Sequence, residues 1–284
     1  MPRTIVRGVG INYDIVGDRG PCILLIQGGR QDMELFRPLA ENLAAEGGGH
    51  RVLMHDRRNS GGSDIALGTE RSEEEIFADD AHALCEQFGA LPVIACGGAG
   101  GSRHCILLAL RHPGAVRCLL LWWPSGSRTS AEQLAEQYYG QYITAAEAGG
   151  MPAVLATPYY TERAARVPEN SDRLLSLDRN EFVETMRRWR QFFLDGADMP
   201  VIGVDTDTVG TISVPTCIIP GHDVIHPQAV GEALARILPN AELQYLPPLE
   251  RPQTDEARRQ ARFEHQRRLA DVFLDFLARH PEVS

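Results

Sequence analysis

Six short apolar runs constrain the fold of this 284-residue chain more than any other feature. Each run ends in glycine, in proline or in a polar loop that contains glycine. The runs lie at residues 21–29, 51–64, 92–98, 116–124, 214–223 and 241–248. Continuous apolar runs of about five residues predict strands that are buried on both faces, as in a parallel sheet.

Helical patterns fill the gaps between these runs, at residues 33–47, 72–90, 226–240 and 255–280. Ser72 followed by three Glu is typical of a helix start, because the hydroxyl can accept a free backbone N–H and the acids face the positive helix end. Pro227 suits a first helical turn. The alternation predicts an α/β fold with a mostly parallel central sheet and right-handed crossovers.

Residues 125–212 break this alternation and show only helical patterns. We therefore predict a core formed by residues 1–124 and 213–284, with a helical cap inserted at 125–212. The cap holds nine of the 19 aromatic residues, and these could line an apolar ligand pocket or fill the cap's own core. Trp122 and Trp123 end a predicted central strand, close to where a cleft would lie.

Composition narrows the possible partners. A formal net charge of -10 argues against binding to nucleic acid or to an anionic membrane surface. No apolar run approaches the roughly 18 to 20 residues of a membrane span, and the first residues lack a signal-peptide pattern, so we expect a soluble cytoplasmic protein. The six Cys show no Cys-x-x-Cys pair, so we expect buried free thiols, no metal and no cofactor.

Residues 97–101 read Gly-Gly-Ala-Gly-Gly, between a predicted buried strand and a predicted helix. Such a turn needs glycine because side chains beside its strained centre would collide with the neighbouring strand and helix. The pattern resembles the nucleophile elbow of the α/β-hydrolase fold, with Ala99 in place of serine. A tight turn without chemistry is the alternative interpretation.

Three further motifs support the resemblance in the expected order, so that it covers nearly the whole chain. Residues 24–29 resemble the strand and oxyanion loop of that family. Residues 55–64 resemble its Asp-x-Arg-Gly-x-Gly-x-Ser loop, and residues 214–227 resemble the strand and loop that present an acid. In the second motif, the residues expected to be structural are Asp56, Arg57, Gly61 and Ser63, and the residues expected to reach the site are Arg58 or Asn59.

The resemblance implies a role for each matching position. Ala99 occupies the place of the nucleophile, and the backbone N–H groups of Gly100 and of Gly29 or Gly28 would form an oxyanion hole. Ser102 is a conceivable substitute nucleophile, but on a helix it would point nearly a full turn away.

The remaining implied roles concern the acid and the substrate. Asp223 matches the acid that orients a base, although an Asp at this place could equally cap the following helix. Arg30 and Trp123 are expected to contact the substrate.

The base departs from the family pattern, because residues 247–256, which come directly after the predicted strand and should supply it, contain no histidine. His265 is our first choice, with a solvent-exposed helix position as the competing interpretation. His222 and His226 flank Asp223, and we expect bases so close to the acid to be hard to aim at position 99. Glu250 or an ordered water is the next candidate, and His104 is expected to pack within its helix.

These roles imply a hydrolase that acts on a small, mainly apolar ester, lactone or carbon–carbon bond substrate. Three explanations of Ala99 stay open. It replaces a serine by substitution, it belongs to an inactive ligand-binding protein, or it belongs to a non-hydrolytic, cofactor-free lyase, cyclase or oxygenase.

Overall fold

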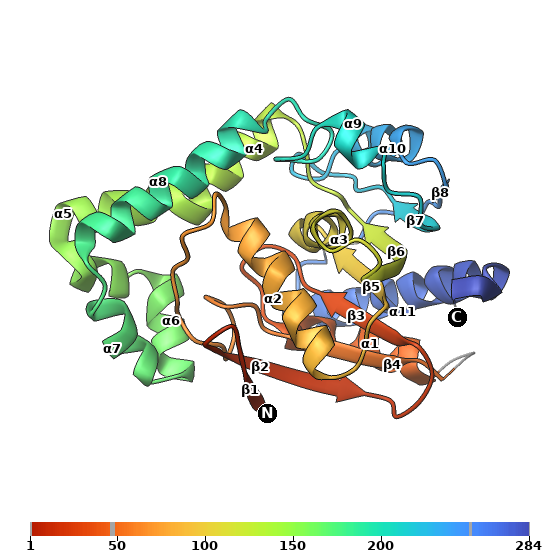
Figure 1. Cartoon of the computed structure of the whole chain (residues 1–284), viewed down its shortest axis with the longest axis horizontal. Helices are drawn as coiled ribbons and strands as arrows, with labels where there is room; N and C mark the ends of the chain where they lie inside the picture. The colour runs from red at the N-terminus through yellow and green to blue at the C-terminus, as the bar shows by residue number, and fades with distance from the viewer. Residues whose placement is uncertain (1, 46–48, 250–251, 284) are drawn as a thin grey trace.

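A computed structural model describes residues 2–45, 49–249 and 252–283. Its strands form one eight-stranded sheet in the order β1-β2-β4-β3-β5-β6-β7-β8 (Figure 1). The six strands from β4 to β8 in this order run parallel to one another. The strands are β1 (Arg3–Val6), β2 (Val9–Val16), β3 (Cys22–Ile26), β4 (Arg51–His55), β5 (Val93–Gly98), β6 (Val116–Trp122), β7 (Thr216–Ile219) and β8 (Ala241–Leu243). The six predicted apolar runs coincide with β3 to β8, so the predicted parallel sheet is confirmed.

The hairpin of β1 and β2 was not predicted. Its turn lies at Arg7 and Gly8, which both have positive φ (47° and 80°), and β2 continues the sheet by pairing antiparallel with β4. Along β1, exposed and half-buried residues precede Val6, the first buried position. An edge hairpin of mixed polarity lacks the continuous apolar run that marks the central strands.

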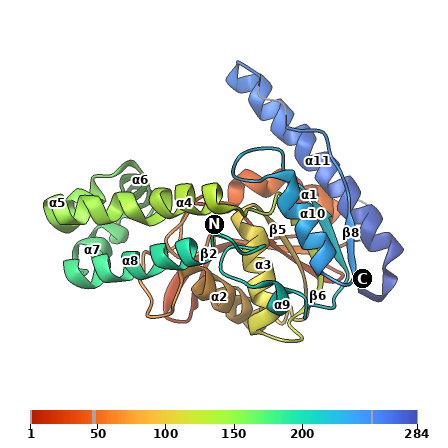
Figure 2. The same cartoon turned by 90° about the horizontal axis from the view of Figure 1, so that it is seen from above.

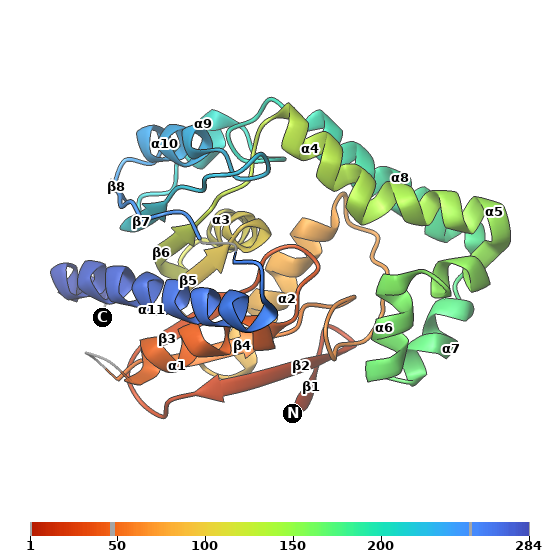
Figure 3. The same ribbon diagram turned by 180° about the vertical axis from the view of Figure 1, so that it is seen from behind.

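Helices cover both faces of the sheet (Figure 2). One buried cluster joins the sheet to α1 (Arg37–Ala45) and α11 (Asp255–Arg279), which lie side by side in Figure 3. The cluster on the other face involves α2 (Glu73–Gln87), α3 (Gly100–Arg111) and α10 (Gln228–Ile237). Two short 3-10 turns, η1 (Met33–Phe36) and η3 (Pro281–Val283), complete the core.

The predicted start of α2 is confirmed by its cap. The Ser72 hydroxyl accepts the Glu75 N–H at 3.1 Å, and the Glu75 carboxylate accepts the Ser72 N–H at 3.2 Å. Helix α2 is thus fixed at the end that faces the cap.

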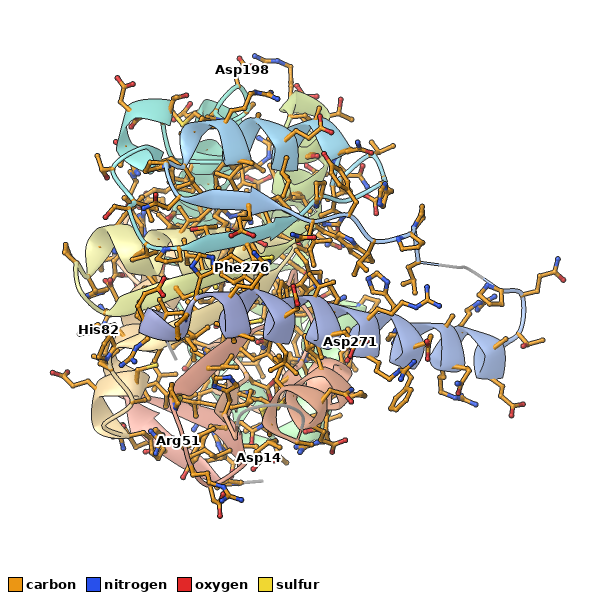
Figure 4. All side chains as sticks on the ribbon, turned by 90° about the vertical axis from the view of Figure 1, so that its right-hand side faces the viewer. Asp14, Arg51, His82, Asp198, Asp271 and Phe276 are labelled. Carbon is orange, nitrogen blue, oxygen red and sulfur yellow. The ribbon has the colours of Figure 1, made fainter. Side chains whose placement is uncertain are left out.

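Helix α11 extends beyond the body of the protein at its start. Figure 4 shows its first turns projecting, whereas Phe276 in its last turns is fully buried.

A long helical region is inserted between β6 and β7 and extends to one side of the sheet (Figure 1). It comprises α4 (Arg128–Ala135), the π-helical turn η2 (Glu136–Gly140), α5 (Gln141–Leu155), α6 (Pro158–Arg166), α7 (Glu169–Leu175), α8 (Arg179–Asp195) and α9 (Thr206–Val209). Most of the aromatic residues in this region form its own core. One buried cluster contains Tyr138, Tyr139, Tyr142, Tyr160, Trp189, Phe192 and Phe193. The aromatic residues therefore serve mainly to hold the cap together.

Two expectations from composition can be compared with these elements. None of the helices in the described ranges is both long enough and apolar enough to cross a membrane. All six cysteines are free and buried, as predicted.

Candidate active site at the elbow

The turn between β5 and α3 holds Ala99 in an unusual backbone conformation, with φ 51° and ψ −120°. Its N–H donates to the carbonyl oxygen of Trp122 at 3.0 Å. A Cβ on Gly97 would lie 2.4 Å from the Gly101 oxygen, and one on Gly101 would lie 2.2 Å from the Ile26 oxygen. The glycines two positions either side of Ala99 are therefore required by close packing, as the sequence predicts.

The loop after β3 lies directly against this turn. A Cβ on Gly28 would come within 2.7 Å of the Ala99 Cβ and 3.4 Å of the Gly100 nitrogen. Gly29 has φ 49°, and its nitrogen lies 3.2 Å from where a Cβ of Gly100 would stand. The two backbone N–H groups expected to form an oxyanion hole are thus brought together next to Ala99.

Ser102 is fixed in a structural role. Its side chain is buried, and its hydroxyl lies 2.9 Å from the Gly97 carbonyl oxygen and 3.0 Å from the Trp122 carbonyl oxygen. A hydroxyl engaged between two main-chain carbonyls braces the turn and is not directed at a substrate.

In the loop after β4, the predicted structural roles of Asp56, Gly61 and Ser63 are confirmed. The buried Asp56 carboxylate accepts the Asn12 amide at 2.7 Å and the backbone N–H groups of Met33 at 2.8 Å and Gly62 at 2.7 Å. A Cβ on Gly61 would lie 2.0 Å from the Asp56 Cγ, so glycine is required there. The hydroxyl of Ser63 donates to the Asp56 main-chain oxygen at 2.6 Å, which is also a structural role.

The structure reverses the roles predicted for the two arginines of this loop. Arg58 was expected to reach the site, but its guanidinium forms a buried, two-point ion pair with Asp80 of α2, at 2.6 and 2.7 Å. Arg57, expected to be structural, points to the elbow. Asn59, the other predicted site residue, donates its amide to Glu73 at 2.8 Å.

A small pocket of about 10 Å³ lies beside the elbow, between the core and the cap. Its lining consists of Gly29, Arg30, Arg57, Ser60, Glu73, Glu74, Phe77, Gly100, Arg103, His104 and Tyr138. Of the predicted substrate contacts, Arg30 is in this lining and Trp123 is not. His104, expected only to pack within its helix, also lines the space and contacts Glu74 through Nε2 at 2.5 Å.

The loop after β7 joins an acid to a histidine. One Asp223 oxygen, Oδ1, accepts the N–H groups of Ile225 and His226 and lies 2.9 Å from the His226 ring nitrogen Nδ1. Burial acts to raise the pKa of Asp223, but the bonds and charge of His226 outweigh it, so the pKa lies below its ordinary value. Asp223 therefore both closes its loop and orients an imidazole.

His265 also lies beside Trp123. The two rings are 5.0 Å apart, and the Trp123 ring is 6.1 Å from that of His226. His265 is only 8% exposed, so the interpretation as a solvated helix position is wrong. Burial, with Arg268 nearby, lowers its pKa to about 4. The ring that Asp223 contacts is that of His226. The spacing of three residues between them, within one turn, is the sequence feature that could have indicated this contact.

Glu250, the remaining candidate base, lies outside the described residues. His222 contacts the carbonyl oxygen of Leu246 through its ring Nε2 at 3.0 Å. Among the histidines near the acid, His226 is thus the one whose ring lies against the Asp223 carboxylate.

A family model described as the alpha/beta hydrolase fold matches residues 21–248. The chain belongs to the α/β-hydrolase fold family. Over 115 residues it is 33% identical to a relative from Bacillus subtilis named "Uncharacterized hydrolase YraK", and this match spans 40% of the chain and 41% of the relative. The chain thus matches less than half the length of that relative.

Solved structures agree with the fold along nearly the whole chain. An enol-lactonase from Burkholderia xenovorans is similar with a TM-score of 0.64 and 22% identity, covering 98% of this chain and 100% of the enzyme. An esterase from Thermogutta terrifontis, solved with malate bound, gives a TM-score of 0.66 and 19% identity, covering 98% and 99%. At such identities, the likeness concerns the fold.

Proposed function

We propose that this chain is a hydrolase of small esters or lactones in which a water molecule takes the place of the side-chain nucleophile. The observation that carries the proposal is the elbow: Ala99 keeps its strained backbone, with the N–H groups of Gly28–Gly29 and Gly100 gathered beside it. Solved relatives that are named as an enol-lactonase and an esterase support a carbonyl substrate.

The reaction follows from the residues at the elbow. The substrate carbonyl oxygen would accept the N–H groups of Gly29 and Gly100, which stabilise negative charge as it develops there. Nε2 of His226 would take a proton from water while the oxygen of that water attacks the carbonyl carbon. The tetrahedral intermediate would then expel the alcohol, which receives the proton back from His226.

Asp223 prepares His226 for this role. Because the carboxylate bonds to Nδ1 at 2.9 Å, the neutral ring carries its proton there and leaves Nε2 as the basic nitrogen. The methyl group of Ala99 leaves unfilled the place where a serine hydroxyl would stand, and this is where the water would lie.

Ala99 itself favours a second candidate, a protein that binds its ligand without hydrolysis or converts it by lyase, cyclase or oxygenase chemistry. The fold and elbow would serve such a role equally well. Hydrolysis of a carbon–carbon bond, which the sequence suggests beside esters and lactones, would belong to the first candidate.

The test is hydrolysis of p-nitrophenyl acetate and of γ-butyrolactone by the unaltered chain and by four variants. We expect His226→Gln and Asp223→Asn to lower kcat/KM by about 10² or more, as loss of a general base does. His265→Gln is the matched control and should retain full activity. Absence of turnover in the unaltered chain would refute the proposal.

The fourth variant, Ala99→Ser, separates the two mechanisms. It should accumulate a covalent acyl adduct, visible by intact-protein mass spectrometry, that the unaltered chain never forms. If only Ala99→Ser turns over, the attack by water is refuted and the binding role is favoured.

A further inference from the structure

The side chains around the small pocket at the elbow form two buried ion pairs. Arg30 of the loop after β3 lies 2.8 Å from the Glu73 carboxylate, and Arg103 of α3 lies 2.8 Å from Glu74. Both carboxylates and Arg103 are about 2% exposed. Each pair neutralises itself, as buried charges must.

Arg57 is the third guanidinium in this lining, and it is only 3% exposed. Its hydrogen bonds in the described structure go to the carbonyl oxygen of Gly29 and to the ring of His104, with Nη1 3.2 Å from Nδ1. Its Nε–H is buried and has no hydrogen-bond partner within the described ranges. The face of Phe77 lies 4.8 Å from its guanidinium carbon, and the charge of Glu74, already paired with Arg103, also acts on it.

The acceptor ring of His104 carries no compensating charge. Burial lowers the pKa of His104 to about 4, with the Arg57 charge acting in the same direction against Glu74. At neutral pH, the ring is uncharged, so Nε2–H donates to Glu74 and Nδ1 accepts from Arg57. Three guanidinium groups therefore share two carboxylates in this lining, which leaves one positive charge in excess.

A water molecule could fill the space but could not neutralise that charge. The volume of about 10 Å³ is close to what one water-sized group needs. One oxygen of a carboxylate has this size and also carries the missing negative charge. The backbone nitrogens of Gly29 and Gly100 lie beside the same space, so a group bound there is next to Ala99.

We infer that the elbow cavity takes a ligand bearing a free carboxylate, and that Arg57 is its counter-ion. This inference rests on the proposed function for the place of the ligand, and it narrows the substrate class to esters or lactones that carry a carboxylate. It replaces the expectation of a mainly apolar substrate, since the described lining is largely charged.

The test is binding, which does not depend on turnover. Titration calorimetry compares monomethyl glutarate with its neutral isostere, the primary amide of the same half-ester. The unaltered chain should bind the acid at least tenfold more tightly than the amide, a difference of about 1.4 kcal/mol. Equal affinity for the two compounds would overturn the inference even if no variant could be purified.

Two variants locate the preference. Arg57→Gln should lose the preference for the acid while its affinity for the amide stays unchanged. Arg19→Gln, which removes the same charge from a side chain that is 85% exposed, should keep the preference. A preference that survives in Arg57→Gln would also overturn the inference. If the chain hydrolyses neutral esters but binds acid and amide equally, the proposed function stands and this inference falls. If it prefers the acid but hydrolyses no ester, this inference stands and the proposed function falls.

Discussion

Replacing His104 with glutamine tests the electrostatics of the elbow through the pH dependence of stability. The folded protein holds His104 with a pKa of about 4, against an ordinary value of 6.5. Between these pH values the unfolded chain binds a proton that the folded protein excludes, so stability is complete above pH 6.5 and is lost as the pH falls toward 4.

The magnitude follows from the two pKa values. Lowering the pH from 7.5 to 5 should reduce the free energy of unfolding by about 2 kcal/mol through His104 alone. Glutamine can still donate to Glu74 and accept from Arg57, but it does not titrate. The curve of His104→Gln should therefore be flatter than that of the parent by this amount.

The assay is urea unfolding followed by tryptophan fluorescence at half-unit steps from pH 5 to 7.5. His280→Gln serves as the control, because Glu242 and Glu282 raise the pKa of this half-buried histidine, so its contribution has the opposite sign. Parallel curves for the parent and His104→Gln would refute the reasoning. They would mean that the pKa of His104 is the same in the folded and the unfolded protein, so that burial does not keep its ring uncharged.

Three further substitutions test the construction of the elbow by the same urea assay. Ser102→Ala should destabilise the fold by about 1 kcal/mol, because the carbonyls of Gly97 and Trp122 lose the one hydroxyl proton that they share, and an unchanged midpoint would contradict the bracing role. Gly98→Ala should be severely destabilised, because a Cβ there would lie 2.0 Å from the Trp122 ring; a variant of native stability would show that the ring moves at little expense. Ala99→Gly should raise stability by about 1 kcal/mol by relieving the positive φ, and a loss of stability would argue against strain at this position.

The elbow could be predicted from the sequence because packing there leaves few alternatives. Gly97 and Gly101 approach main-chain oxygens so closely that no side chain fits, and such constraints are visible as glycines in a fixed pattern. The central strands were equally readable, since strands buried on both faces need continuous apolar runs. The edge hairpin lacked that signature.

The roles of Arg57 and Arg58 could not be read in the same way. The two arginines are neighbours at the start of a turn after β4, and their side chains part there, one beside Gly29 and the other against α2. The choice depends on Asp80, which lies 22 residues along the chain on α2 and holds Arg58. The contact between Asp223 and His226 could not be predicted for a related reason, because it depends on how the turn around Asp223 folds the ring back onto the carboxylate.

The six cysteines give the protein a built-in set of reporters of local opening. They are distributed over four strands and two helices: Cys22, Cys96, Cys118 and Cys217 in β3, β5, β6 and β7, with Cys85 in α2 and Cys105 in α3. Burial raises the pKa of each thiol for which a shift is resolved, including Cys217 to about 12, so a thiolate forms only when the surrounding element separates from the sheet. The rate at which a disulfide reagent labels each thiol therefore measures how often that element opens, without any engineered probe.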